Sequence, residues 1–278
     1  MRVMSGCSHE VVLPSMEMLR ARRDSKWTIM FGEADMSANR LEAHQHTRNP
    51  DLRLVPAYTV AEAAHYVRRP EATLRSWVAG RVYPASGNAK RSRPIIKLDD
   101  PERRHLSFLN LVEAHVLAAI VVHHGVKLPK VRPALDYVQR HFKIERPLIH
   151  QEFETDGLDL FVNRYGALIN ASSFGQQAMK EIIGVYLKRI ERDPAGLPIR
   201  LFPFTRDSES GVAPLKSDPR LVVMTPTVSF GRPVVAGTGI PVSAIYERYK
   251  AGDSVAELVR DFRLETSAVE EAIRCEAA

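Results

Sequence analysis

The sequence predicts an α+β protein that is mostly helical, with a helix-turn-helix unit near each end of its ordered part. Three observations indicate this class. Apolar residues recur at helical spacing in most segments. Ser or Thr stands three residues before Glu at several expected helix starts. Alternation of apolar and polar residues, which is typical of strands, is confined to short segments beside glycine.

Composition sets the expected limits of the domains. Residues 1–56 show no clean periodicity, which predicts a disordered extension, and residues 207–219 have the composition of a linker. Three ordered parts are left between and after them. We expect a winged helix-turn-helix over residues 57–104, a helical dimerisation and small α+β module over 105–206, and a C-terminal helix-turn-helix domain over 220–278.

The bulk properties also limit the partners. A formal charge of +6 permits a polyanionic partner without requiring one. The two cysteines, Cys7 and Cys275, can form neither a disulfide framework nor a four-thiolate zinc site. We therefore expect a cytoplasmic protein without a metal or cofactor. The apolar run over residues 106–126 contains Asn110 and Glu113, which favours a buried or dimerising helix over a membrane span.

The first helix-turn-helix is predicted from its caps. Thr59 and Glu62 form a capping box that begins one helix, and Pro70 can occupy the first position of a second helix, which Gly80 ends. The apolar face of that second helix consists of Leu74, Trp77 and Val78. Two short extended arms follow on either side of a turn at residues 86–88, so a hairpin, or wing, is expected there.

This module carries a basic run that suggests DNA contact. From residue 72 to residue 98 there is no acidic residue. The second helix presents Thr73, Arg75 and Ser76 outward, and Arg75 is the candidate for a contact with a guanine edge. The candidates for phosphate contacts are Arg81, Lys90, Arg91, Arg93 and Lys97. The alternative is a solvated charged face on which Arg75 forms an ion pair within its helix.

The middle of the chain combines helices with a meander. Helices are expected over residues 107–124 and 128–142, and the first is apolar nearly all round, which favours a dimer interface as its cover. The alternation over residues 147–172 predicts a three-stranded meander. A helix over 175–192 and a strand over 197–206 follow.

The stretch GRPVVAGTGIPV, residues 231–242, looks at first like a phosphate-binding loop. Val242 occupies the position of the third glycine of a dinucleotide fingerprint, and no Lys-Ser/Thr pair follows, so this reading fails. The glycine-rich stretch instead predicts a structural turn that leads into helices. The residues of this turn are Gly231, Pro233, Gly237, Gly239 and Pro241.

Three short helices follow, and their starts are predicted from Ser243, from the pair Ser254 and Glu257, and from the pair Ser267 and Glu270. A link of three residues joins the last two helices, which predicts a second helix-turn-helix. Acidic and basic residues alternate along this unit, so contact with another protein is favoured over contact with DNA.

The C-terminal stretch resembles a domain of VapB-type antitoxins, whose members share Gly-Arg-Pro, Gly-Thr-x-Ile-Pro-Val and a final helical pair. The resemblance covers about 50 residues. The matching positions are Gly231, Arg232, Pro233, Gly237, Thr238, Ile240, Pro241, Val242, Gly252 and Ser254. At the first helix-turn-helix, which resembles the MerR type, the sequence departs from common patterns, because Arg68-Arg69-Pro70 occupies the turn.

The resemblance implies a non-catalytic antitoxin that neutralises a PIN-like ribonuclease toxin, binds its own operator DNA as an autorepressor and forms a homodimer or higher oligomer. By charge complementarity Arg232 could contact the acidic metal site of the toxin, although a structural role in its turn is an equal alternative. The second hypothesis is a MerR-like transcriptional regulator that senses a small ligand through its middle module. An enzyme is the least favoured reading.

Overall fold

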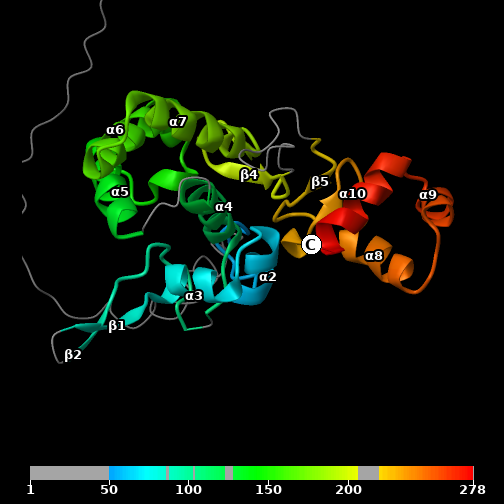
Figure 1. Ribbon diagram of the computed structural model, residues 1–278. Helices are drawn as coiled ribbons and strands as arrows, with labels where there is room; N and C mark the ends of the chain where they lie inside the picture. Colours follow the sequence, from blue (N-terminus) through cyan, green and yellow to red (C-terminus); the bar gives the residue numbers. More distant parts are fainter. Residues whose placement is uncertain (1–49, 86–87, 103, 123–127, 206–218, 278) are drawn as a thin grey trace, which may run out of the picture. The chain divides into compact units, whose positions relative to one another are not determined.

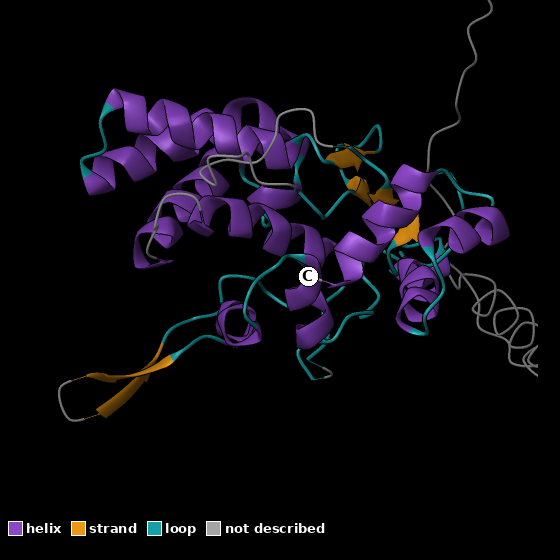
Figure 2. Cartoon of the chain, turned by 45° about the vertical axis from the view of Figure 1, so that its right-hand side comes forward, coloured by secondary structure: helices purple, strands orange, loops and turns teal. Residues whose placement is uncertain are grey.

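The computed structural model of the chain describes residues 50–85, 88–102, 104–122, 128–205 and 219–277 (Figure 1). Helices dominate these residues, and strands occur only as short antiparallel pairs (Figure 2). The predicted class, mostly helical with small strand pairs, is therefore confirmed. Most of the expected extension and nearly all of the expected linker lie outside the described residues.

The N-terminal module contains two short helices, α2 (Val60–Tyr66) and α3 (Glu71–Ala79), joined by a turn at residues 67–70. The predicted capping box is confirmed: the Thr59 hydroxyl accepts from the Glu62 amide, and the Glu62 carboxylate accepts from the Thr59 amide. Pro70 is the N-cap of α3 rather than its first helical residue, and Gly80 ends the helix as predicted. The strands β1 (Val82–Ala85) and β2 (Asn88–Arg91) then pair as a hairpin.

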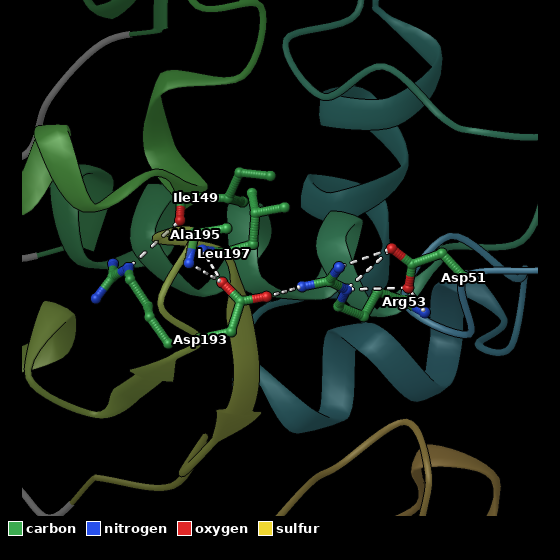
Figure 3. Close-up of polar contacts among 7 residues, drawn as sticks. Asp51, Arg53, Ile149, Asp193, Ala195 and Leu197 are labelled. Carbon is green, nitrogen blue, oxygen red and sulfur yellow. Dashed lines mark hydrogen bonds and ion pairs between the residues drawn. The ribbon is translucent and has the colours of Figure 1, made fainter. Parts of the chain in front are cut away.

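Residues 50–56, the end of the expected extension, have a defined structure (Figure 3). Arg53 donates to the Asp51 carboxylate at 2.8–3.0 Å and to the Asp193 carboxylate at 2.8 Å. Asp193 also accepts from the amides of Ala195 and Leu197 in a β-turn 140 residues away in the sequence. The sequence did not indicate this order, because it depends on a charge pair between distant segments.

The middle of the fold is built around α4 (Phe108–Val122), which packs against α7 (Ser173–Leu187) and β4 (Pro198–Leu201). Every residue from 106 to 120 is buried within the single chain. The chain therefore covers this helix with its own elements, and the prediction that a dimer interface covers it is wrong. The helix α5 (Leu128–Phe142) has the predicted bounds and packs against α6 (Leu158–Ile169).

The predicted three-stranded meander is absent from the described residues. The 3-10 turn η1 (Pro147–Ile149), the π-helical segment η2 (Phe153–Gly157) and α6 take its place. The same apolar residues that alternate locally also recur every three to four positions, and helical packing buries them on one face of α6. They are Leu158, Phe161, Val162 and Tyr165. Glycines at 157 and 166 lie within this helical region instead of forming turns.

After α7, the strands β3 (Ile190–Arg192) and β4 form a hairpin, so the predicted helix over 175–192 ends five residues early. The strand predicted over 197–206 is confirmed only over residues 198–201. A bridge between Leu201 and Met224 then joins β4 to the start of the C-terminal domain.

The C-terminal domain begins with β5 (Val222–Val223) and β6 (Val234–Val235), which flank the 3-10 turn η3 (Ser229–Gly231). The helices α8 (Val242–Lys250), α9 (Val255–Phe262) and α10 (Thr266–Ala277) follow, and α10 packs on both others. The capping box of Ser254 and Glu257 is confirmed. The caps predicted at Ser243 and Ser267 are wrong, because α8 and α10 each begin one residue earlier and contain these serines.

Candidate nucleic-acid and partner interfaces

The outward face of α3 carries the residues predicted to read bases. Leu74, Trp77 and Val78 are buried, so α3 turns Thr73, Arg75 and Ser76 away from the core. The Arg75 side chain is 66% exposed and pairs with Glu71 one turn earlier. The Ser76 hydroxyl donates to the Thr73 carbonyl at 2.7 Å. An exposed pair at this spacing contributes only about 0.3–0.5 kcal/mol, so a DNA base or phosphate can displace Glu71 at low cost.

The hairpin after α3 brings more basic side chains to the same module, and Figure 1 shows it projecting beyond α3. Lys90 pairs with Tyr83 and Arg91 with Val82 across the two strands, so the two basic side chains lie on opposite faces of the hairpin. Arg81, Lys90 and Arg91 are all exposed. Arg91 also donates to the Ala79 carbonyl at 3.1 Å, which fastens β2 to the end of α3.

Arg93 and Lys97 lie on another side of the module. Together with α5 they line a cavity of about 300 Å³, whose wall includes Arg132, Asp136 and Glu113. Arg132 donates to the Pro94 carbonyl at 3.1 Å, and burial together with the nearby Arg93 lowers the pKa of Arg132. The eight predicted DNA contacts thus divide into six on α3 and the hairpin and two that face the middle module.

The Gly-rich stretch contains two turns, and the first of them contacts the N-terminal module. Gly231 has φ 80°, and a Cβ there would lie 2.2 Å from the Tyr58 hydroxyl. That hydroxyl, on a fully buried side chain, donates to the Gly231 carbonyl at 2.9 Å. Only glycine fits this close approach with this backbone conformation. The contact joins residues 173 positions apart in the sequence.

The second turn of the stretch depends on Gly237. The Thr238 amide donates to the Val235 carbonyl at 3.1 Å, which closes a β-turn with Gly237 at its third position and φ 76°. The Thr238 hydroxyl donates to the same carbonyl and accepts from the Ile240 amide.

The other turn residues have different roles. The Pro233 carbonyl accepts from the Val242 amide at 3.0 Å, and Pro241 is the N-cap of α8. The structure gives no comparable reason for glycine at Gly239, where φ is outside the left-handed region and a Cβ would meet open space.

Arg232 points to α2 in the N-terminal module. Its guanidinium pairs with Glu62, the carboxylate of the α2 capping box, and lies 3.5 Å from the Tyr66 hydroxyl. Burial alone would raise the pKa of Glu62, but hydrogen bonds from Thr59 and Arg232 outweigh it and lower that pKa. The Arg232 side chain remains 41% exposed. It can therefore hold α2 in place and still present charge to a partner.

Two features of these surfaces had no signal in the sequence. Arg68, in the turn between α2 and α3, has φ 51°, and its guanidinium lies 5.5 Å from the centre of the Phe204 ring. Phe230, beside Gly231, is 90% exposed and has φ 54°. Neither residue type predicts a left-handed backbone, so only the structure identifies these positions.

Charges on the C-terminal helices largely pair with each other. Arg248 on α8 donates to Asp253 at 2.6 Å and to Asp261 on α9 at 2.8 Å, while Arg274 pairs with the buried Glu271 on α10. Residues 220–278 contain seven basic and eight acidic residues. This domain therefore lacks the basic surface that the N-terminal module carries.

Within the described ranges, no three His, Cys, Asp or Glu side chains are grouped so as to hold a metal ion. None of the helices in the described part of the chain is both long and apolar enough to cross a bilayer.

Two family models match the chain. The model described as "Putative DNA-binding HTH domain" matches residues 56–135, which include α2, α3, the hairpin and α4. The model described as "Protein of unknown function (DUF433)" matches residues 222–274, which include the Gly231 turn and most of the three C-terminal helices. The basic surface thus lies in the first matched segment, and the Gly-Arg-Pro turn lies in the second.

Proteins of Mycobacterium tuberculosis resemble the chain over most of its length. It is 31% identical over 243 residues to the "Putative antitoxin VapB45" of strain ATCC 25618 / H37Rv, an alignment that covers 81% of this chain and 95% of the relative. The crystal structure of Rv2018 matches with a TM-score of 0.55 at 22% identity, covering 79% of this chain and 97% of that chain. This second likeness shows the fold alone.

Proposed function

Because the chain belongs to the family of the "Putative antitoxin VapB45", we propose that it is the non-catalytic antitoxin of a type II toxin–antitoxin system. In this role it neutralises a PIN-like ribonuclease toxin and binds its own operator DNA as an autorepressor. The observation that carries the proposal is the 31% identity over nearly the whole length of that relative. The match to a DNA-binding helix-turn-helix domain supports the second activity.

The proposed DNA surface consists of α3 and the β1–β2 hairpin, arranged as a winged helix-turn-helix of MerR type. Thr73, Arg75 and Ser76 face the major groove, where the Arg75 guanidinium can leave Glu71 and pair with a guanine edge. Arg81, Lys90 and Arg91 bind phosphates around this contact, and Arg93 and Lys97 extend it toward α5. We also propose that two copies of the chain bind a two-fold symmetric operator as a homodimer. The interface between the copies does not involve the buried faces of α4.

The proposed toxin surface lies on the C-terminal domain at the Gly-Arg-Pro turn. Arg232 keeps an exposed part of its guanidinium side chain beside its pair with Glu62. A nuclease that holds catalytic metal ions presents a cluster of carboxylates, to which an arginine is complementary in charge. The nearly balanced charge of residues 220–278 favours a protein partner for this domain over DNA.

The experiment that tests this function is co-purification of the full-length chain with the nuclease encoded by the neighbouring gene. The proposal predicts a complex that survives gel filtration. The isolated chain should also bind its own promoter fragment in a salt-sensitive manner. Absence of both a neighbouring nuclease and any complex would contradict the antitoxin assignment.

One observation favours the alternative, a MerR-like regulator that senses a small ligand without a toxin partner. The cavity of about 300 Å³ connects Arg93 and Lys97 of the DNA-binding module with α5 of the middle module. A ligand bound in this cavity would contact both the DNA-binding module and the middle module. Promoter affinity that changes when a cell extract of small molecules is added, in a chain that binds no nuclease, would favour this second function.

A further inference from the structure

The turn η3 contains three consecutive residues with left-handed backbone. The φ angles of Ser229, Phe230 and Gly231 are 47°, 54° and 80°. Glycine adopts this region freely, but a side chain with a Cβ does so only at a cost in conformational energy. A bulky aromatic residue in this conformation is a rare case that the surrounding structure must enforce.

Contacts on both sides hold the turn in this conformation. The Gly231 amide donates to the Val228 carbonyl at 2.9 Å, and the Arg232 amide donates to the Ser229 carbonyl at 3.0 Å. Val228 packs against an apolar cluster that includes Phe202 and Val234. On the other side, the Tyr58 hydroxyl donates to the Gly231 carbonyl. The turn is therefore fixed at both ends, and its strain is retained in the folded chain.

The side chain that this strain presents is Phe230, which is 90% exposed. Burial of an aromatic ring stabilises a fold, but here the ring gains no burial to offset the strained backbone. Arg232, two residues later, is 41% exposed. Aromatic residues and arginine are enriched among the side chains that contribute most to the binding of protein partners.

We propose that Phe230 is the hydrophobic anchor with which the chain binds its nuclease toxin. This inference rests on the proposed antitoxin function and assigns a side chain to it. The ring would enter an apolar pocket beside the acidic rim of the nuclease, while Arg232 faces that rim. Because the turn is held rigid before binding, the ring loses little conformational freedom when it docks.

The nearby charges favour a protein over DNA as the occupant. Residues 220–278 carry seven basic and eight acidic side chains, so the charge of this domain is nearly balanced. Phosphates would gain little there. The acid-free stretch from residue 72 to residue 98 offers DNA a better surface on the other module.

The test compares variants of the full-length chain for binding to the nuclease of the neighbouring gene by isothermal titration calorimetry. Phe230→Ala should weaken binding by about 30-fold or more, as expected for a hot spot. Phe174→Ala is the matched control, since Phe174 on α7 is also highly exposed, at 85%, but lies far from the turn in the sequence. Its affinity should equal that of the wild type.

A second variant separates strain from binding. Asn tolerates left-handed backbone better than Phe, so Phe230→Asn should melt at the wild-type temperature or above it and still bind the nuclease poorly. If the wild type binds the nuclease and both Phe230 variants have affinities within about 3-fold of the wild-type value, the effect is much smaller than that of a hot-spot residue. This inference is then contradicted, while the antitoxin function is retained. If wild type does not bind, both fall. If the isolated wild-type chain is an oligomer and the isolated Phe230→Asn variant is a monomer, the inference is overturned, because Phe230 then binds a second copy of the chain.

Discussion

At the scale of single residues, the buried His115 on α4 is a group whose charge the fold excludes. One of its ring nitrogens lies 3.4 Å from the Tyr186 carbonyl. The centres of the His115 and Tyr186 rings are 5.2 Å apart, and the rings are tilted relative to each other. Burial lowers the pKa of His115 to about 3. In an unfolded chain the pKa of histidine is about 6.5. Between these two values the unfolded chain binds a proton that the folded chain does not.

His115 therefore contributes stability that is fully present above pH 6.5 and is lost as the pH falls toward 3. We expect this group alone to reduce the free energy of unfolding by about 2 kcal/mol between pH 7 and pH 5. His115→Gln should lower the stability at pH 7 but show a smaller loss between the two pH values. Urea unfolding of both proteins at both pH values measures the difference, and equal losses would contradict the assignment.

A pair of glycine substitutions tests the turn that contacts Tyr58. In Gly231→Ala the new methyl group would lie 2.2 Å from the Tyr58 hydroxyl with φ at 80°. We expect a loss of about 2–4 kcal/mol, from the strained backbone and the disturbed buried hydrogen bond. Gly239→Ala is the control, because a Cβ there meets open space, and its stability should stay within about 1 kcal/mol of wild type. Similar losses in urea unfolding would show that the Tyr58 contact does not constrain the turn.

At the scale of secondary-structure elements, the β1–β2 hairpin carries phosphate contacts in our proposal. Lys90→Ala should weaken promoter binding and reduce the slope of log K against log salt by about 0.9, the value for one lost phosphate contact. Lys180→Ala is the matched control, since Lys180 lies on α7 and pairs with Asp159 at 2.6 Å. Fluorescence anisotropy at several salt concentrations gives both slopes. If the two variants have indistinguishable salt slopes, the hairpin is not part of the DNA-binding surface.

The ion pair within α3 gives a prediction with the opposite sign. Glu71 binds the Arg75 guanidinium in the free protein and would face the DNA phosphates. Glu71→Gln should therefore strengthen promoter binding several-fold, whereas Arg75→Ala should weaken it and relax the preference for sequence at one base pair, by about 1–3 kcal/mol. Both variants can be measured by competition with mutated promoter fragments. Arg75→Ala with unchanged sequence preference would assign Arg75 to the solvated face.

Elements were predictable where their cause is local. The capping boxes at Thr59 and Ser254 and the helix over residues 128–142 depend on neighbours in the sequence, and the structure confirms them. The prediction of a meander was wrong because strand-like alternation and helical spacing coincide in a short segment such as α6, and tertiary packing decides between the two structures. The contact of Tyr58 with Gly231 and the strain at Phe230 could not be predicted, since both arise from segments far apart in the sequence.

At the scale of the whole molecule, the two matched segments are in contact at the Gly-Arg-Pro turn. Tyr58 binds Gly231, and Arg232 binds the carboxylate that caps α2. A partner that pulls Arg232 away from Glu62 would release a contact of the DNA-binding module. We therefore expect Arg232→Ala to lower both the affinity for the nuclease and the melting temperature, whereas Phe230→Asn lowers only the affinity. If both variants bind the nuclease as tightly as the wild type does, this turn is not part of the toxin-binding surface.

The measurement that tests the antitoxin assignment most directly is RNA cleavage by the neighbouring nuclease, titrated with the full-length chain at a fixed metal concentration. We expect cleavage to fall in proportion to the added chain and to reach the background level at a fixed molar ratio. Phe230→Asn should need a much larger excess for the same inhibition. Cleavage that stays constant in a several-fold excess of the wild-type chain would contradict the assignment and leave a DNA-binding regulator.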